Sequence, residues 1–169
     1  LVCGKARERQ TADFGLIAKL LRNAFDERSE SADFQSEDGF YLYFRTPIKG
    51  FLSVYLVDEN QNVSCLLPYQ QQQAHSVEVK ADTDYLFFSK KHDNQPFVDE
   101  YVLTAEEKIV QNRIYIVFSP NDFVKITDRV RSKDALRELP FADFQSWLTK
   151  NRSHDAQMQV IEKTLTIGE

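Results

Sequence analysis

The stretch Gly39-Phe40-Tyr41-Leu42-Tyr43-Phe44-Arg45 decides the fold class. Phe40, Leu42 and Phe44 alternate with Tyr41, Tyr43 and Arg45, and this period of two is typical of a β-strand with one buried face. A second strand is predicted at 51–57. The polar run 58–62 then predicts a hairpin turn, because Asp and Asn bond to their own backbone, and a partner strand follows at 63–67.

Further short segments rich in Val, Ile, Tyr and Phe predict more strands. They are Ser76–Lys80, Tyr85–Ser89, Glu100–Thr104, Arg113–Phe118 and Met158–Ile167. We expect the last of these to lie at a sheet edge or to pair with an early strand. Many short strands separated by turns indicate a mainly β protein, an antiparallel β-sandwich of immunoglobulin-like or similar type.

Two helices are predicted beside the strands. Residues Thr11–Arg28 carry apolar side chains at three- and four-residue spacing, which predicts an N-terminal helix. A short C-terminal helix is predicted to begin at Pro140, where the missing N–H of proline costs nothing. Its stripe of Phe141, Phe144, Trp147 and Leu148 is interpreted as core packing rather than as a ligand site.

Charge supports a division of the chain into two parts. Residues 26–38 hold six acidic side chains and one basic one, and this excess accounts for the net charge of −5. We interpret this segment as a solvated linker. The predicted organisation is therefore a helical appendage and acidic linker at 1–38, followed by a β-sandwich domain at 39–169.

The same composition argues against several classes of partner and site. A net negative charge without a strong basic cluster argues against nucleic acid. No stretch approaches the ~20 apolar residues of a transmembrane helix. Cys3 and Cys65 are too far apart in sequence for a disulfide to be assigned or excluded. The glutamine run Gln70–Gln73 is interpreted as a loop.

Candidate catalytic and metal-binding residues are few. His75, His92 and His154 lack metal-ligand spacing, so neither a metal nor a cofactor is predicted. The run Asp58-x-Asn60-x-Asn62 resembles the start of a calcium loop but lacks its glycine and its closing acid. A hydrolase using Cys65 with His75, or Ser153 beside His154, stays open as an alternative, although no local nucleophile motif accompanies these residues.

Tyrosines supply the candidate binding residues. Tyr41, Tyr43 and Tyr55 fall on alternating strand positions, where a row of them would form an exposed face. Tyrosine offers a rigid contact area at a low cost in conformational entropy, which suits recognition of a partner. We therefore predict that this face contacts a protein or a glycan.

Two further segments resemble a known family. The strand 51–58 and the following strand 62–68, with Gly50 before the first and Pro68 after the second, are similar to the opening hairpin of a bacterial domain of unknown function, family four three eight four. Residues 101–121 are similar to its closing strands. The helix 144–152, with the strand 158–167 after it, resembles the Bacteroidetes version of the family.

The resemblance implies a role in recognition and no catalytic activity. Family members follow export signals or accompany peptidases, kinases and helical repeats, and they have no catalytic residues to transfer. We therefore expect a non-enzymatic accessory or recognition module in the periplasm, cell envelope or exterior of a Gram-negative bacterium. The hydrolase, and a purely structural component of a larger assembly, stay open as alternatives.

Overall fold

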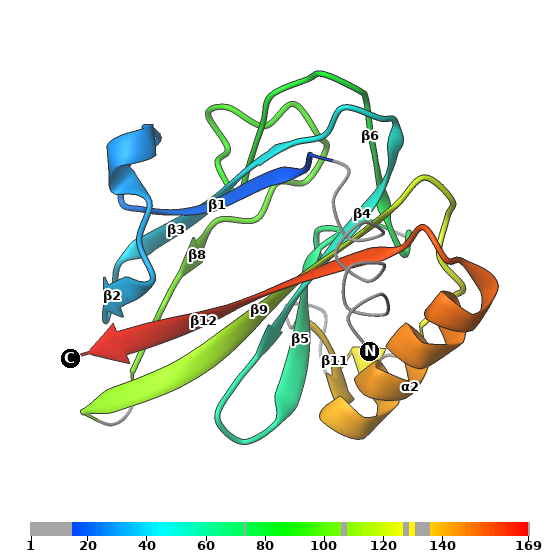
Figure 1. Ribbon diagram of the computed structural model, residues 1–169. Coiled ribbons are helices and arrows are strands. Elements are labelled where there is room, and N and C mark those ends of the chain that lie inside the picture. The colour runs from blue at the N-terminus through cyan, green and yellow to red at the C-terminus, as the bar shows by residue number, and fades with distance from the viewer. Residues whose placement is uncertain (1–14, 73, 106–107, 127–128, 131–135, 169) are drawn as a thin grey trace, which may run out of the picture.

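The computed structural model describes residues 15–168, apart from residues 73, 106–107, 127–128 and 131–135. These residues form two β-sheets and one long helix (Figure 1). The first sheet contains β1 (Ile17–Arg22), β3 (Gly39–Arg45), β7 (Tyr85–Phe87) and β8 (Tyr101–Val102). The second sheet contains β2 (Asp33–Gln35), β4 (Gly50–Val57), β5 (Asn62–Leu67), β6 (Val77–Val79), β9 (Ile109–Ser119), β10 (Arg129–Val130), β11 (Arg137–Pro140) and β12 (Gln159–Gly168).

The alternating residues of β3 place one face of this strand in the main core. Phe40, Leu42 and Phe44 of β3 are fully buried, whereas the residues between them are only partly covered. The buried rings pack in one cluster with apolar side chains of the second sheet, among them Leu52 and Phe118. The predicted mainly β fold is thus confirmed, with a core shared between two sheets.

The predicted N-terminal helix is wrong over its described residues. Ile17–Arg22 is strand β1, which pairs antiparallel with β3 from Ile17 opposite Arg45 to Arg22 opposite Phe40. Residues 11–14 of that prediction lie outside the described residues. The apolar spacing suits a helix in isolation, but β3 offers backbone hydrogen bonds and a core surface for Leu20, and this tertiary context outweighs local propensity.

The described part of the acidic segment also contributes to the sheets. A single 3-10 turn spans Glu27–Ser29, and β2 then pairs in parallel with β12, with Asp33 opposite Thr166. Phe34 of β2 is buried in the main core. Both β1 and β2, from before residue 39, are therefore hydrogen-bonded to strands that come after it.

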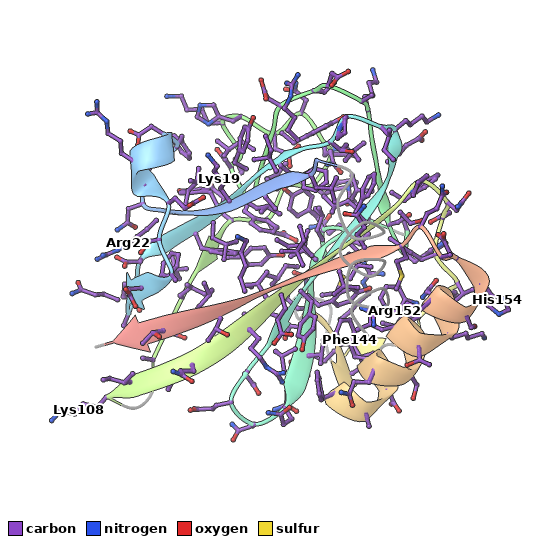
Figure 2. All side chains as sticks on the ribbon, viewed as in Figure 1. Lys19, Arg22, Lys108, Phe144, Arg152 and His154 are labelled. Carbon is purple, nitrogen blue, oxygen red and sulfur yellow. The ribbon has the colours of Figure 1, made fainter. Side chains whose placement is uncertain are left out.

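The predicted C-terminal helix is confirmed as α2 (Phe141–His154), which covers the face of the second sheet opposite the main core. Figure 2 shows Phe144 of α2 pointing toward the sheet. Trp147 is buried in the same cluster, and its indole Nε1 donates a hydrogen bond of 2.8 Å to the carbonyl of Val124. Among the described residues, no helix combines the length and the apolar character needed to cross a bilayer.

Strand β12 is confirmed close to its predicted bounds. It pairs antiparallel with β9 along its whole length and in parallel with the early strand β2 at its end. This arrangement matches the second of the two placements expected for the strand. The short strands β10 and β11, which the sequence did not predict, extend the other side of the sheet next to β5.

Asp38 joins β1 and β3 to the turns around them. Its carboxylate accepts hydrogen bonds from Asn23 Nδ2 at 2.8 Å and from the backbone N–H of Gln35 at 2.6 Å, and it pairs with Arg22 at 2.5 Å. Burial by itself raises the pKa of Asp38, but these hydrogen bonds and the charge of Arg22 together lower it. Asp38 is therefore ionised in the folded protein at neutral pH.

We predict that Asp38→Asn lowers the free energy of unfolding by about 2 kcal/mol at pH 7, because the substitution removes an ion pair and one carboxylate acceptor. A lowered folded-state pKa stabilises the protein above the unfolded value, about 3.9, and this contribution is lost as the pH falls through the folded-state pKa. Urea titrations between about pH 7 and pH 3 measure it. The difference between variant and wild type should shrink toward pH 3, whereas a constant difference would contradict the ionised role. Glu59→Gln, in the exposed hairpin turn, is the control.

Candidate functional site

The outward face of the first sheet carries two of the three predicted binding residues. The antiparallel register places Lys19 opposite Tyr43 and Leu21 opposite Tyr41. Because strand residues alternate between faces, these side chains lie on the side away from the buried rings of β3. Tyr41 and Tyr43 are both partly exposed there.

A turn after β1 folds a further aromatic residue against this face. Asn23 has a positive φ of 59°, and its backbone N–H bonds to the carbonyl of Gly39 at 3.0 Å. The reversed chain brings the Phe25 ring to 4.7 Å from the Tyr41 ring and 4.4 Å from the His92 ring, measured between centroids. Phe25 nevertheless stays 42% exposed. An aromatic side chain is thus held in place with much of its surface in solvent.

A hollow of about 380 Å³ lies beside Phe25, and we name it the Tyr43 hollow. Its lining combines an aromatic ring, a phenol, an ammonium group and two carboxylates. The lining residues are Lys19, Leu21, Phe25, Asp26, Tyr43 and Asp84. They come from β1, the turn after it, β3 and the loop before β7.

The charges at one side of the hollow are fixed by hydrogen bonds. Asp84 Oδ1 accepts from the Tyr43 hydroxyl at 2.5 Å and from Arg45 Nη1 at 3.0 Å. The bond from Tyr43, followed by that from Arg45, lowers the pKa of Asp84, and the bond to Asp84 raises the pKa of Arg45. Asp84 is therefore an anion at neutral pH, oriented by two donors, as a charged contact in a recognition site requires.

Tyr55 is not part of this surface, and its predicted exposure is wrong. It is fully buried in the second sheet, with its ring centroid 4.8 Å from that of Phe144 and 5.5 Å from that of Trp147. The alternating pattern on β4 identifies two faces, but both are covered, one by the first sheet and the other by α2. Tyr55 therefore packs in the core beneath the helix.

Cys65, His75 and Ser153, the candidate residues for hydrolysis, each bond to a different part of the protein. Cys65 is buried beneath α2, with its Sγ 3.6 Å from Arg137 Nη2, whereas His75 lies with its Nε2 3.4 Å from Asp122 Oδ2. Ser153 Oγ donates to the carbonyl of Lys150 within the same helix. None of these bonds joins Cys65 or Ser153 to a histidine.

His154 directly follows Ser153 in the chain and is the other histidine of the hydrolase alternative. His154 is exposed at the end of α2 (Figure 2), and the next residue, Asp155, accepts a hydrogen bond from Ser119. Asp155 also caps its own turn by accepting from the backbone N–H of Gln157 at 2.9 Å. The local run Ser153-His154-Asp155 is therefore not arranged as a proton relay.

The calcium-like run is a hairpin turn, as predicted. Asp58 Oδ1 accepts hydrogen bonds from the backbone N–H groups of Asn60 and Asn62, both at 2.9 Å, and the Asp58 N–H donates to the Asn62 carbonyl. The carboxylate thus organises the connection between β4 and β5. Within the described ranges, no cluster of three or more His, Cys, Asp or Glu side chains is placed to hold a metal ion.

The chain was compared with known protein families, curated proteins and solved structures. No family model, no curated protein and no solved structure matches this chain. The resemblance to the bacterial domain family stays a prediction.

Sequence reasoning found Tyr43 but missed the other five residues of the hollow. Phe25 lies in the predicted N-terminal helix, and Asp26 in the predicted linker. Asp84 lies between the predicted strands Ser76–Lys80 and Tyr85–Ser89, where the sequence indicates only a connection. No local pattern connects these positions, because they converge only through the pairing of β1, β3 and β7.

Proposed function

We propose that this chain is a non-enzymatic recognition module that binds a protein or glycan partner through the outward face of the first sheet. The observation that carries the proposal is the Tyr43 hollow, in which an exposed aromatic ring lies beside fixed charges of both signs. A protein partner is favoured over a glycan for this face, because the surface combines ionised groups with aromatic anchors.

Phe25 and Tyr43 give the hollow two aromatic side chains. Aromatic residues are enriched at the centres of protein interfaces, where they bury a large area and lose few rotamers. Lys19 and Asp26 add one charge of each sign at the rim, while Asp84 is already oriented by Tyr43 and Arg45. A partner with a complementary charge pattern would gain specificity from these groups, and a mismatched partner would be rejected.

The wider setting of the proposal rests on the family resemblance. It places the module in the cell envelope or among the secreted proteins of a Gram-negative bacterium, with its two sheets arranged as a sandwich of immunoglobulin-like or similar type.

Two substitutions test the proposal. A partner captured from envelope extracts by the wild-type chain and then purified should bind Lys19→Glu and Phe25→Ala at least about tenfold more weakly, because each change removes an anchor or reverses a charge at the hollow. Biolayer interferometry with the purified partner gives the dissociation constants.

Lys150→Glu is the matched control, since it reverses an exposed charge on α2, away from the first sheet. This variant should bind like the wild type. Unchanged affinity for both hollow variants, or an equal loss for all three, would refute the assignment of the binding face.

A further inference from the structure

A second hollow, of about 430 Å³, lies between the chain segment that leads into β6 and the loop 95–97. Among the described residues, the carboxamide side chains of Gln71, Gln72 and Gln95 line it, with the exposed ring of Phe97 at one side. We name it the glutamine groove. It shares no lining residue with the Tyr43 hollow and lies within the size range of small-ligand sites, about 300–1,000 Å³.

The groove is organised by hydrogen bonds that join distant parts of the chain. Gln72 Oε1 accepts from the backbone N–H of Tyr69 at 2.8 Å, and its Nε2 donates to Gln95 Oε1 at 3.1 Å and to the Pro96 carbonyl at 3.3 Å. Gln95 is held in turn by a bond of 3.0 Å from its backbone N–H to Asp93. The walls are therefore preorganised, which lowers the cost of binding.

One polar group in the wall has an unused capacity to bond. Gln95 Nε2 is shielded from solvent and has no hydrogen-bond partner in the part of the chain that the structure describes. An unsatisfied amide donor of this kind costs free energy, and a ligand oxygen would supply the missing acceptor once the Gln95 side chain turned its Nε2 toward the groove.

Phe97 is held outward in an unfavourable backbone conformation. Its φ is +63°, a left-handed value that is rare for a bulky side chain, and 58% of the residue is exposed. Neither the backbone strain nor the exposure of the ring contributes to stability. Strain retained next to a hollow is typical of a functional position.

The chemistry of the lining selects a class of ligand. A carboxamide both donates and accepts hydrogen bonds, as a sugar hydroxyl does. The charged residue in the lining, Glu78, is paired with Lys49 at 3.0 Å, and the Ser76 hydroxyl donates to Asp122 at 2.7 Å. A charged ligand would therefore meet no free opposite charge here, whereas an uncharged one meets donors and acceptors beside an aromatic face.

We propose that the glutamine groove binds a neutral oligosaccharide, with a sugar ring stacked on Phe97 and its hydroxyls bonded to the carboxamides of Gln71 and Gln95. The aromatic ring supplies the apolar contact with the C–H face of the sugar, and the carboxamides supply orientation. This site is independent of the protein-binding face proposed above.

Titration of the ¹⁵N-labelled chain with maltohexaose, cellohexaose and chitohexaose tests the proposal. At least one of these should shift the side-chain NH₂ signals of Gln71 and Gln95 with a dissociation constant of about 1 mM or tighter. A hexamer of galacturonate, which is anionic, should bind at least tenfold more weakly than the best neutral ligand. No shift from any neutral hexamer at about 10 mM would overturn the proposal, as would binding of the galacturonate alone.

Variants locate the site. Phe97→Gly should weaken binding of the best hexamer at least about fivefold and should raise the melting temperature, because glycine adopts φ +63° without strain. Ile109→Ala removes an exposed apolar side chain outside both hollows and should leave sugar binding unchanged. Unaltered binding by Phe97→Gly would overturn the proposal, whereas weaker protein binding by Phe25→Ala concerns only the Tyr43 hollow.

Discussion

Phe144→Ala is expected to lower the free energy of unfolding by about 3–5 kcal/mol, because it empties the centre of the cluster between α2 and the second sheet. Phe144 is fully buried, and its ring lies 4.8 Å from Tyr55, 5.2 Å from Tyr115 and 5.9 Å from Trp147, between centroids. Loss of the ring leaves a cavity that three fixed aromatic neighbours cannot fill. Guanidinium titration followed by tryptophan fluorescence measures the loss.

Phe25→Ala makes the same chemical change at a residue that is 42% exposed. The ring there touches Tyr41 and His92 on the surface, and the expected loss is about 1 kcal/mol or less. Equal losses for the two variants would contradict the central position of Phe144. A smaller loss for Phe144→Ala than for Phe25→Ala would do so even more strongly.

Gly50→Ala is expected to destabilise the protein by about 3 kcal/mol through a steric clash at the start of β4. An added Cβ would lie 2.5 Å from the backbone carbonyl oxygen of Ser119 and 2.5 Å from Cζ of Phe118. Both neighbours belong to β9, which pairs with β4 directly after this residue. The backbone oxygen cannot move without disturbing that pairing, so we expect a lower melting temperature in calorimetry.

Gly168→Ala provides the matched control, since it introduces the same methyl group into another strand of the same sheet. The nearest atom to that methyl group would be the Phe34 carbonyl oxygen at 4.0 Å, an ordinary contact. The stability should change by less than about 0.5 kcal/mol. If Gly50→Ala proved equally neutral, the close packing of β4 on β9 would be contradicted.

Most strands of this fold could be predicted from local sequence, either from alternation or from segments rich in Val, Ile, Tyr and Phe. The pattern around Phe40, Leu42 and Phe44 is local, because one buried face forces a period of two wherever the strand lies. The turn at Asp58 and the helix that begins after Pro140 also depend on neighbouring residues, through side-chain hydrogen bonds and a restricted φ. These elements were therefore predicted close to their observed bounds.

Strand β1 shows why other elements could not be predicted in this way. Ile17, Leu21 and Phe25 have helical spacing, yet Leu21 lies in a strand and is buried, while Phe25 lies in the turn that follows. The decision between helix and strand depends on the free edge of β3, whose paired residues lie 18 to 28 positions further along the chain. No window of local sequence contains that information.

In the candidate site too, local sequence predicts some residues, whereas others depend on contacts between distant segments. Tyr41 and Tyr43 are partly exposed, as the alternation along β3 predicts, whereas Phe40, Leu42 and Phe44 between and beside them are buried. The same reasoning fails for Tyr55, since the sequence of β4 does not reveal that α2 packs over its second face. Asp84 reaches Tyr43 only through the pairing of β3 with β7, and the short strand β7 gives no sign of its partner.

The parallel pairing of β2 with β12 has a consequence for biosynthesis. Among the described strands, β2 finds its partner only in β12, so each residue of β2 waits for a residue made 133 positions later, as Asp33 does for Thr166. The buried Phe34 cannot reach its final surroundings while the ribosome is still translating the helix. Completion of the second sheet is therefore a late event, set by contacts of high sequence separation rather than by the order in which the strands emerge.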